Sequence, residues 1–284
     1  MPTFVDIVDA LDERVAPFRD VRDRDLRGRD GTFLVESARI VRRLLGTPFR
    51  VRSLLLTPRR RQELLDVLSA LPEAITINVA DEAVLGAISG YHVHGGALAI
   101  VERPSWRELT TTALLDRVVV GARRTLVALA GVTHMDNVGS IFRSAAGLSC
   151  DGVILDDRCC DPLLRKPIRV AMGHSLTTPF AQTRDLLADL RLLRDAHGFA
   201  VVGAESREHP AAAARIRPLC ELPRRDRVVL LFGNEGHGLD AELIDGCDAL
   251  VEIPMRREVP SLNVAVAAAI VMYERSRSTE AGAC

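Results

Sequence analysis

Short, continuous apolar runs recur through the second half of the chain, and segments with apolar residues at helical spacing separate them. Strands that are apolar throughout are typical of a parallel sheet with helices on both faces. The runs that predict strands are residues 126–130, 152–155, 200–203, 227–232 and 249–253. The segments that predict helices are residues 140–148, 185–196 and 263–274. The pattern therefore predicts an α/β fold with a parallel sheet.

The first 105 residues carry a smaller version of the same alternation. Strand-like runs occur at residues 51–56, 74–79 and 97–101, with a helical pattern at 61–71 between the first two. Residues 33–36, followed by apolar residues at 38, 41, 44 and 45, predict the entry into an amphipathic helix. Pro104 breaks the pattern between two apolar segments, as proline does in linkers. We therefore expect a small α/β domain over residues 1–105, a linker over 106–119, a larger α/β domain over 120–276 and a loose tail over 277–284.

Three polar segments interrupt the apolar pattern of the second half where predicted strands end. They are NVGSIFR at 137–143, LLFGNEGHGL at 230–239 and IPMRREVPSLNVAVA at 253–267. In an open α/β sheet, ligands bind outside the carboxyl ends of the strands, where such loops meet. The three segments together predict one binding site, although each alone is a weak signal.

The composition is that of an ordinary globular protein, with 284 residues, 48% hydrophobic residues and 26% charged residues. The net charge of −1 does not mark the whole chain as a nucleic-acid binder, but the arginine-rich stretch 14–61 allows a local basic face. The six cysteines form no Cys-x-x-Cys pair, and no apolar stretch reaches the roughly 18 residues of a membrane helix. We therefore expect a cytoplasmic protein with reduced thiols.

Each polar segment also has an ordinary structural explanation. Asn137 could cap a helix with Gly139 in its first turn, and Ser261 could cap the helix that follows it. The glycines of the second segment could form a turn, but glycines also let backbone groups face a ligand. This segment lacks the lysine of a phosphate loop and the spacing of a dinucleotide fingerprint, so a nucleoside-like ligand without a polyphosphate fits better.

The histidines do not predict a metal site. His92 and His94 stand two residues apart, but no Asp, Glu or Cys lies in register with them, which favours a structural or surface role. His237 lies inside the glycine-rich segment, and nothing in the pattern gives it a proton-transfer role.

Taken together, the three segments resemble the three motifs of the SpoU/TrmH family of RNA ribose 2′-O-methyltransferases, within the SPOUT class. That family carries N-x-G-x-x-x-R, then a GNEG-type loop, then IPM followed by SLNV. All three occur here in that order, with DPLLRKPIRVAMG at 161–173 between the first two. The similarity covers residues 120–276. The first part, with FLVESARIVRRLL and GYHVHGGALAI, is similar to the RNA-binding domain, related to a ribosomal-protein fold, that often precedes it.

The resemblance implies a C-terminal parallel-sheet domain with a deep trefoil knot, preceded by a small α/β RNA-binding domain. It also implies a homodimer formed through the C-terminal domain, tRNA or rRNA as substrate, S-adenosylmethionine as methyl donor and no required metal. Carried over to this sequence, the adenosine contacts fall on Gly233, Ile253 and Leu262. The neighbours expected to line the same pocket are Phe232, Asn234 and Met255.

The reaction that the resemblance implies is an in-line displacement at a sulfonium methyl group by a ribose 2′-hydroxyl. Arg143 matches the family's essential arginine. Because a guanidinium with a pKa above about 12 is a poor general base, we expect Arg143 to stabilise the developing oxyanion or to hold the adjacent phosphate. The residues expected to position Arg143 and the ribose are Asn137, Glu235, Ser261 and Asn263.

Two positions depart from the family's pattern. The stretch 256–260 has no glycine between IPM and SLNV, and Ser149 stands where the helix of the first motif usually has a glycine. The missing glycine supports an alternative interpretation, an RNA-binding protein with a degenerate methyltransferase domain. A dinucleotide-dependent enzyme on a doubly wound fold is a second alternative, and the absence of G-x-G-x-x-G speaks against it.

Overall fold

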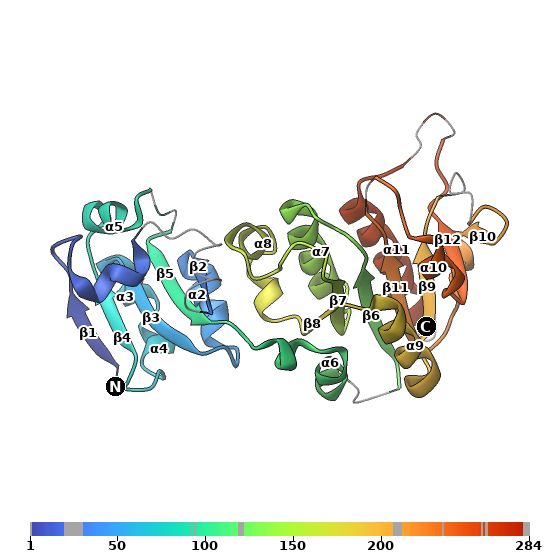
Figure 1. Ribbon diagram of the computed structural model, residues 1–284. Helices are drawn as coiled ribbons and strands as arrows, with labels where there is room; N and C mark the ends of the chain where they lie inside the picture. The colour runs from blue at the N-terminus through green and yellow to red at the C-terminus, as the bar shows by residue number, and fades with distance from the viewer. Residues whose placement is uncertain are drawn as a thin grey trace. The chain divides into compact units, whose positions relative to one another are not determined.

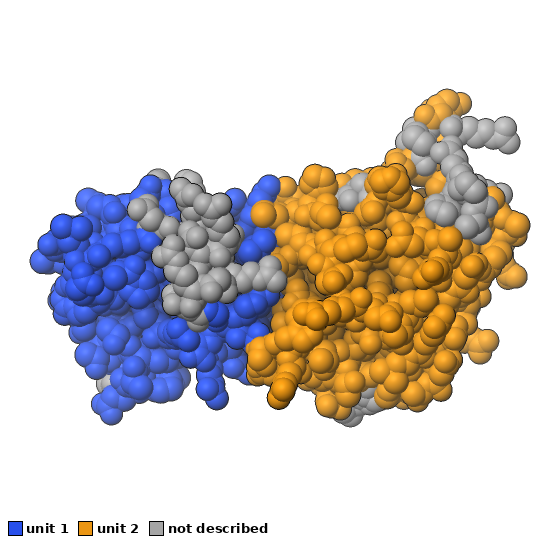
Figure 2. Space-filling model, viewed as in Figure 1, with its two compact units in different colours: residues 1–104, 163–177 blue, residues 105–162, 178–284 orange. Residues whose placement is uncertain are grey.

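The computed structural model describes residues 2–19, 31–91, 93, 95–118, 122–206, 212–234, 236–256, 258 and 261–280, without the side chains of 278–280. The chain forms two compact units, which Figure 2 shows in different colours. Unit 1 comprises Met1–Pro104 and Leu163–Thr177, and unit 2 comprises Ser105–Pro162 and Thr178–Cys284. None of the described helices is long and apolar enough to cross a membrane.

Unit 1 is built on a five-stranded mixed sheet with the strand order β1-β4-β3-β5-β2 (Figure 1). In it, β1, β4 and β3 run parallel, and β5 is antiparallel to both β3 and β2. The strands are β1 (Thr3–Asp6), β2 (Thr32–Glu36), β3 (Val51–Leu56), β4 (Thr76–Val79) and β5 (Ala97–Glu102). The sequence pattern missed β1, because none of its residues is fully buried and it shows no apolar run. Residues 33–36, predicted as the entry into a helix, instead belong to β2, because a short run that is buried throughout has no alternation to mark it as a strand.

Short helices accompany the sheet of unit 1, and one of them comes from a distant part of the chain. The helices are η1 (Glu13–Phe18), α2 (Ala38–Leu45), α3 (Pro58–Glu63), α4 (Leu65–Leu68), α5 (Glu82–Ser89), α8 (Arg165–Val170) and η3 (His174–Leu176). The distant helix, α8, packs against β2. Arg165 donates from Nη2 to Oε2 of the buried Glu36 over 3.1 Å, and its guanidinium carbon lies 4.5 Å from the centroid of the Tyr91 ring.

Unit 2 contains a seven-stranded sheet in the order β10-β12-β9-β11-β6-β7-β8, and every pair of neighbours is parallel. Its strands are β6 (Arg124–Leu129), β7 (Gly152–Asp156), β8 (Phe180–Thr183), β9 (Ala200–Ala204), β10 (Ile216–Pro218), β11 (Arg227–Phe232) and β12 (Ala249–Glu252). The predicted parallel sheet is confirmed. Because all neighbours are parallel, the carboxyl ends of the strands lie along one edge.

Helices cover both faces of this sheet. Successive residues of a strand point to opposite faces. Accordingly, Ala181 of β8 packs in the apolar core with α6 and α9, whereas Phe180 meets Phe142 of α7 edge to face, with 5.9 Å between ring centroids. The first layer consists of α6 (Thr111–Val118), α9 (Leu186–His197) and α10 (Ala241–Asp245). The second consists of α7 (Met135–Gly147) and α11 (Val264–Glu280), which pack along each other (Figure 1).

The segment predicted as a linker, residues 106–119, contributes to unit 2. It forms η2 (Trp106–Leu109) and α6, and both contact β8. Leu109, Leu114 and Leu115 are buried there, so burial of apolar side chains holds these elements on the sheet. A second short helix, η4 (Leu219–Glu221), follows β10.

Candidate active site

The loops that carry the second and third polar segments start at neighbouring points of the carboxyl edge. The strands that lead into them, β11 and β12, both pair with β9, one on each side. Two strand spacings, about 10 Å, therefore separate the two loop origins, and the end of β9 lies between them. Phe232 is buried as the last residue of β11, and Ile253 is half-buried directly after β12.

The glycine-rich loop after β11 is held in a closed conformation by its own hydrogen bonds. Asn234 Oδ1 accepts from the backbone N–H groups of Gly236 and His237, each over 2.8 Å, and Gly238 N donates to Asn234 O over 3.1 Å. A Cβ on Gly233 would lie 2.2 Å from the carbonyl carbon of Gly238, which no side chain tolerates. The closed loop therefore requires glycine at position 233, and Glu235 lies outside the described residues.

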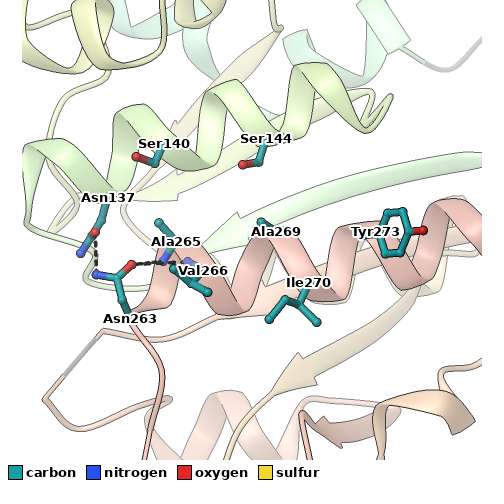
Figure 3. Close-up of a pocket in the computed structure, with 9 residues that line it drawn as sticks. All are labelled: Asn137, Ser140, Ser144, Asn263, Ala265, Val266, Ala269, Ile270 and Tyr273. Carbon is teal, nitrogen blue, oxygen red and sulfur yellow. Dashed lines mark hydrogen bonds between the residues drawn. The ribbon is translucent and has the colours of Figure 1, made fainter.

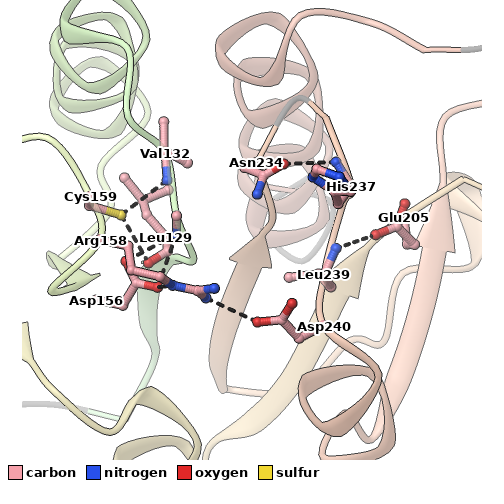
Figure 4. Close-up of polar contacts among 11 residues, drawn as sticks. Leu129, Val132, Asp156, Arg158, Cys159, Glu205, Asn234, His237, Leu239 and Asp240 are labelled. Atoms are coloured by element: carbon pink, nitrogen blue, oxygen red, sulfur yellow. Dashed lines mark hydrogen bonds and ion pairs between the residues drawn. The ribbon is translucent and has the colours of Figure 1, made fainter.

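Glu205, which follows β9, accepts a hydrogen bond from this loop (Figure 4). Its Oε2 accepts from Leu239 N over 2.8 Å, and its Oε1 accepts from Ser206 N over 2.8 Å. A Cβ on Gly238 would lie 2.3 Å from Oε2, so the carboxylate fills the space beside that glycine. The sequence pattern ended this strand at residue 203 and gave Glu205 no role. The signal that could have identified Glu205 in the sequence is an acidic residue directly after a predicted strand of the parallel sheet, where loops that bind ligands begin.

A second polar cluster joins the loops after β6 and β7 to the far side of the glycine loop (Figure 4). The buried Asp156 accepts from Gly131 N with both carboxylate oxygens, each at 3.0 Å. Arg158 donates from Nε to Asp156 Oδ2 over 2.9 Å and from Nη2 to Asp240 Oδ2 over 3.0 Å. The hydrogen bond with Asp156 raises the pKa of Arg158, so the guanidinium stays charged. Asp156 thus binds the loop after β6, and Arg158 connects Asp156 to the residue that precedes α10.

Cys159 closes the loop that follows β6. Its sulfur accepts from Val132 N at 3.3 Å and donates to Leu129 O at 3.4 Å. Burial raises the pKa of the thiol, which keeps the proton needed for that second bond. Within the described residues no group of three or more His, Cys, Asp or Glu side chains could hold a metal ion, and His92 and His94 lie outside those residues.

The first and third polar segments meet through two asparagines (Figure 3). Asn263 donates from Nδ2 to Asn137 Oδ1 over 3.0 Å. Its own Oδ1 accepts from Ala265 N at 2.9 Å and from Val266 N at 3.3 Å, the geometry of a helix cap. Asn263 thus caps α11 and ties it to α7 with a single amide.

Two predicted helix caps are wrong. The first helix begins at Met135, five residues before the predicted start, with His134 in the cap position, so Asn137 lies inside its first turn. The third-segment helix begins at Val264, so Asn263 takes the place that the sequence suggested for Ser261. Spacing alone does not reveal these shifts, because the residues around each start are compatible with a helix over several positions.

Arg143 lies on α7 with its side chain exposed. Among the described residues it makes no hydrogen bond or ion pair, so no carboxylate neutralises its charge. Neither Arg143 nor the exposed Ser261 is hydrogen-bonded to the Asn137–Asn263 pair. Met255 is 39% exposed, and Leu262 is half-buried. The structure therefore joins two of the predicted polar residues directly and leaves the arginine free for an external anion.

A groove of about 510 Å³ runs between α7 and α11, next to the asparagine pair (Figure 3). Most of its surface is apolar and comes from α11. Val266 and Tyr273 are 49% and 54% exposed, which is unusual for large apolar side chains. The residues that line the groove are Asn137, Ser140 and Ser144 of α7, and Asn263, Ala265, Val266, Ala269, Ile270 and Tyr273 at or along α11.

Comparisons with known proteins converge on one family. A family model described as the SpoU rRNA Methylase family matches residues 124–273. An uncharacterized tRNA/rRNA methyltransferase of Mycobacterium tuberculosis is 36% identical over 277 residues, 96% of this chain and 92% of that protein. The 23S rRNA (guanosine(2553)-2′-O)-methyltransferase of Bacillus subtilis is 27% identical over 267 residues, 94% of this chain and 97% of that protein.

One solved structure matches over nearly its full length. The SpoU methyltransferase AviRb from Streptomyces viridochromogenes, in complex with the cofactor AdoMet, is 26% identical, with a TM-score of 0.75. The match covers 95% of this chain and 100% of that one. The likeness therefore extends over both units.

The cap at Asn263 yields a stability prediction. Asn263→Ala removes the acceptor for two backbone N–H groups at the start of α11, and we expect the free energy of unfolding to fall by about 1–2 kcal/mol. Asn263→Asp retains this acceptor but, like Asn263→Ala, loses the Nδ2 donor to Asn137, so it should be less stable than the parent and more stable than Asn263→Ala. Urea titrations of both variants measure this difference. Equal midpoints for Asn263→Ala and the parent would show that the cap contributes nothing.

Proposed function

Because the chain belongs to the SpoU rRNA Methylase family, we propose that it transfers the methyl group of S-adenosylmethionine to a ribose 2′-hydroxyl of structured tRNA or rRNA in the cytoplasm. The observation that carries this proposal is that the glycine loop and the segment after β12 begin on either side of the carboxyl end of β9. The family relatives named above support the reaction class, and the AdoMet complex of AviRb supports the methyl donor.

The residues at this edge fit a nucleoside-like methyl donor. The adenine ring needs apolar surface and backbone partners, and the residues available are Phe232, Gly233, Asn234, Ile253, Met255 and Leu262. Gly233 brings two backbone segments into close contact, which places backbone donors and acceptors next to the proposed adenosine site. The donor itself would supply a methyl group bonded to a positively charged sulfur.

The chain's own residues have separate tasks in the proposed reaction. Arg143 faces the developing oxyanion or the adjacent phosphate, because its guanidinium is charged and has no partner among the described residues. The Oδ1 of Asn263 accepts from the first N–H groups of α11, and its Nδ2 donates to Asn137. We therefore propose that these two residues hold α7 and α11 in place. Ser261 and Glu235 remain proposed contacts of the ribose.

A substitution at Arg143 tests this assignment. Arg143→Ala removes the charge that stabilises the transition state, and we expect the methyl-transfer rate to fall about 10²- to 10³-fold. The affinity for S-adenosylmethionine and the melting temperature should stay near those of the parent. Arg143→Lys keeps a charge without the planar fork and should recover only part of the rate. Transfer of labelled methyl to separated tRNA and rRNA, followed by nucleoside analysis, measures the rate and identifies the product.

The same assay separates the main alternative, an RNA-binding protein with a degenerate methyltransferase domain. The stretch 256–260 without glycine favours that alternative. If the parent protein binds RNA but neither binds S-adenosylmethionine nor transfers methyl, the alternative is correct. If the labelled methyl group is found on a base and not on a ribose 2′-oxygen, S-adenosylmethionine is still the donor, but the proposed acceptor is wrong.

Glu205 provides a test of the cofactor loop. Glu205→Ala leaves the Leu239 N–H without its acceptor and opens space beside Gly238. Leaving this N–H without an acceptor should cost about 1–3 kcal/mol in the free energy of the closed loop. We therefore expect roughly tenfold weaker binding of S-adenosylmethionine, measured by calorimetry. Glu205→Gln keeps one of the two oxygen acceptors but places its amide NH2 against the other backbone N–H, so it should bind with an affinity between those of Glu205→Ala and the parent. Glu242→Ala, an exposed acid on α10, is the matched control. Parent-like binding by Glu205→Ala would refute this role.

We further propose that unit 2 contains a trefoil knot and forms a homodimer. The route of the chain supports the knot: β12 lies on the far side of β9 from β11, yet α11 after it contacts β11, β9 and α7. The apolar groove between α7 and α11 supports the dimer, because a second copy would cover the exposed Val266 and Tyr273.

A charge placed in the groove tests the dimer. Val266→Glu introduces a carboxylate that a dimer would bury without a partner, so we expect a folded monomer with strongly reduced methyl transfer. Leu192→Glu is the matched control, because Leu192 is 38% exposed on α9 in the opposite layer. Light scattering after size-exclusion chromatography gives the mass. A dimeric Val266→Glu protein would contradict the proposed interface.

A further inference from the structure

An exposed tryptophan stands apart from the residues assigned above. Trp106 is the only tryptophan of the chain and is 44% exposed on η2, at the start of unit 2. The guanidinium carbon of Arg184 lies 5.4 Å from the centroid of its ring, within the range of a cation–π contact. Arg184 is itself exposed and directly follows β8.

The strand register places this pair at the same edge as the candidate active site. Phe232 of β11 pairs with Leu129 of β6, which pairs with Leu155 of β7. The next residue of β7, Asp156, pairs with Thr183 at the end of β8. Arg184 therefore emerges at the carboxyl edge, three strand spacings, or about 14 Å, from β11.

The charge of Arg184 is available to an external group. Its one contact among the described residues is the Trp106 ring, and it has no carboxylate partner there. A guanidinium pairs with phosphate oxygens through its planar fork, and it also stacks on aromatic rings. An exposed indole is a surface on which an unpaired nucleobase stacks.

The surroundings favour RNA over a protein partner. The residues next to Trp106 in the chain, Ser105, Arg107 and Glu108, are polar and exposed, so these neighbours add no apolar surface to the ring. The η2 helix contacts α6, in the layer opposite α7 and α11. A dimer formed through the α7–α11 groove therefore leaves the tryptophan open.

We propose that Trp106 and Arg184 form a base-stacking site for an unpaired nucleotide of the RNA substrate. The base stacks on the indole, and Arg184 contacts a neighbouring phosphate. The inference rests on the proposed function, since it assigns part of the substrate RNA to a surface of unit 2. It predicts that substrate recognition includes single-stranded RNA beside the nucleotide that is methylated.

Because Trp106 is the sole tryptophan, its fluorescence reports on this site alone. The probes are an oligouridylate of about twelve nucleotides and a blunt RNA duplex of similar length, a size within the range that single-strand binding sites accommodate. We expect saturable quenching by the single strand and little change with the duplex, whose bases are not free to stack. Anisotropy of labelled RNA shows when the protein is saturated with the single strand. Unchanged Trp106 fluorescence at that concentration would overturn the proposal.

Variants test the two residues separately by the same anisotropy measurement. Trp106→Ala should weaken binding of the oligouridylate at least fivefold, as loss of one stacked base typically does. Trp106→Phe should retain most of the affinity, and Arg184→Ala should lose part of it. Arg191→Ala, an exposed arginine on α9, is the matched control. Equal affinity of Trp106→Ala, Arg191→Ala and the parent would also overturn the proposal.

Methyl transfer separates this inference from the proposed function. If Trp106→Ala binds and methylates RNA like the parent, the stacking site is wrong and the proposed function stands. If the parent neither binds RNA nor transfers methyl, both are wrong. Weaker RNA binding by Trp106→Ala, with unchanged affinity for S-adenosylmethionine, supports the stacking site.

Discussion

The parallel pairing of all seven strands of unit 2 is the constraint on which the site depends. Parallel neighbours cannot be joined by tight turns, so each connection crosses a face of the sheet and returns to the amino edge. Helices consequently cover both faces, and the loops that leave the strands collect at the carboxyl edge. Residues from distant parts of the chain, such as Gly131, Glu205 and Asp240, meet at that edge because of this pairing alone.

The positions of these loops are fixed mainly by charge and backbone hydrogen bonds. Glu205 binds the N–H of Leu239, and Asp156 binds the N–H of Gly131, so each carboxylate satisfies backbone donors that a loop would otherwise leave to water. Arg158 then connects Asp156 to Asp240. A nucleoside held largely by backbone atoms needs such support, because its affinity depends on how little the loops must reorganise on binding.

Long apolar runs were predictable from the sequence, and so were the motifs. Four of the described strands were missed. β1 and β10 are short and show no apolar run, β8 carries the buried polar residues Gln182 and Thr183, and the apolar run of β2 leads directly into the helix that follows it. The motifs predicted that Asn137 and Asn263 belong to one site, and the structure joins them by a hydrogen bond between residues 126 positions apart. Local patterns describe neighbours in the chain, and a contact of this kind depends on how the sheet places two helices together.

The segment Leu163–Thr177 has a consequence for how the protein is made. It supplies α8 and Arg165 to unit 1, although β6 and β7 of unit 2 precede it in the chain. During synthesis, unit 1 therefore lacks α8 until this segment has left the ribosome, by which time β6 and β7 of the second sheet have already emerged. The two units consequently form in an interleaved order, and a fragment ending at Pro104 would leave Glu36 without the cation that it pairs with.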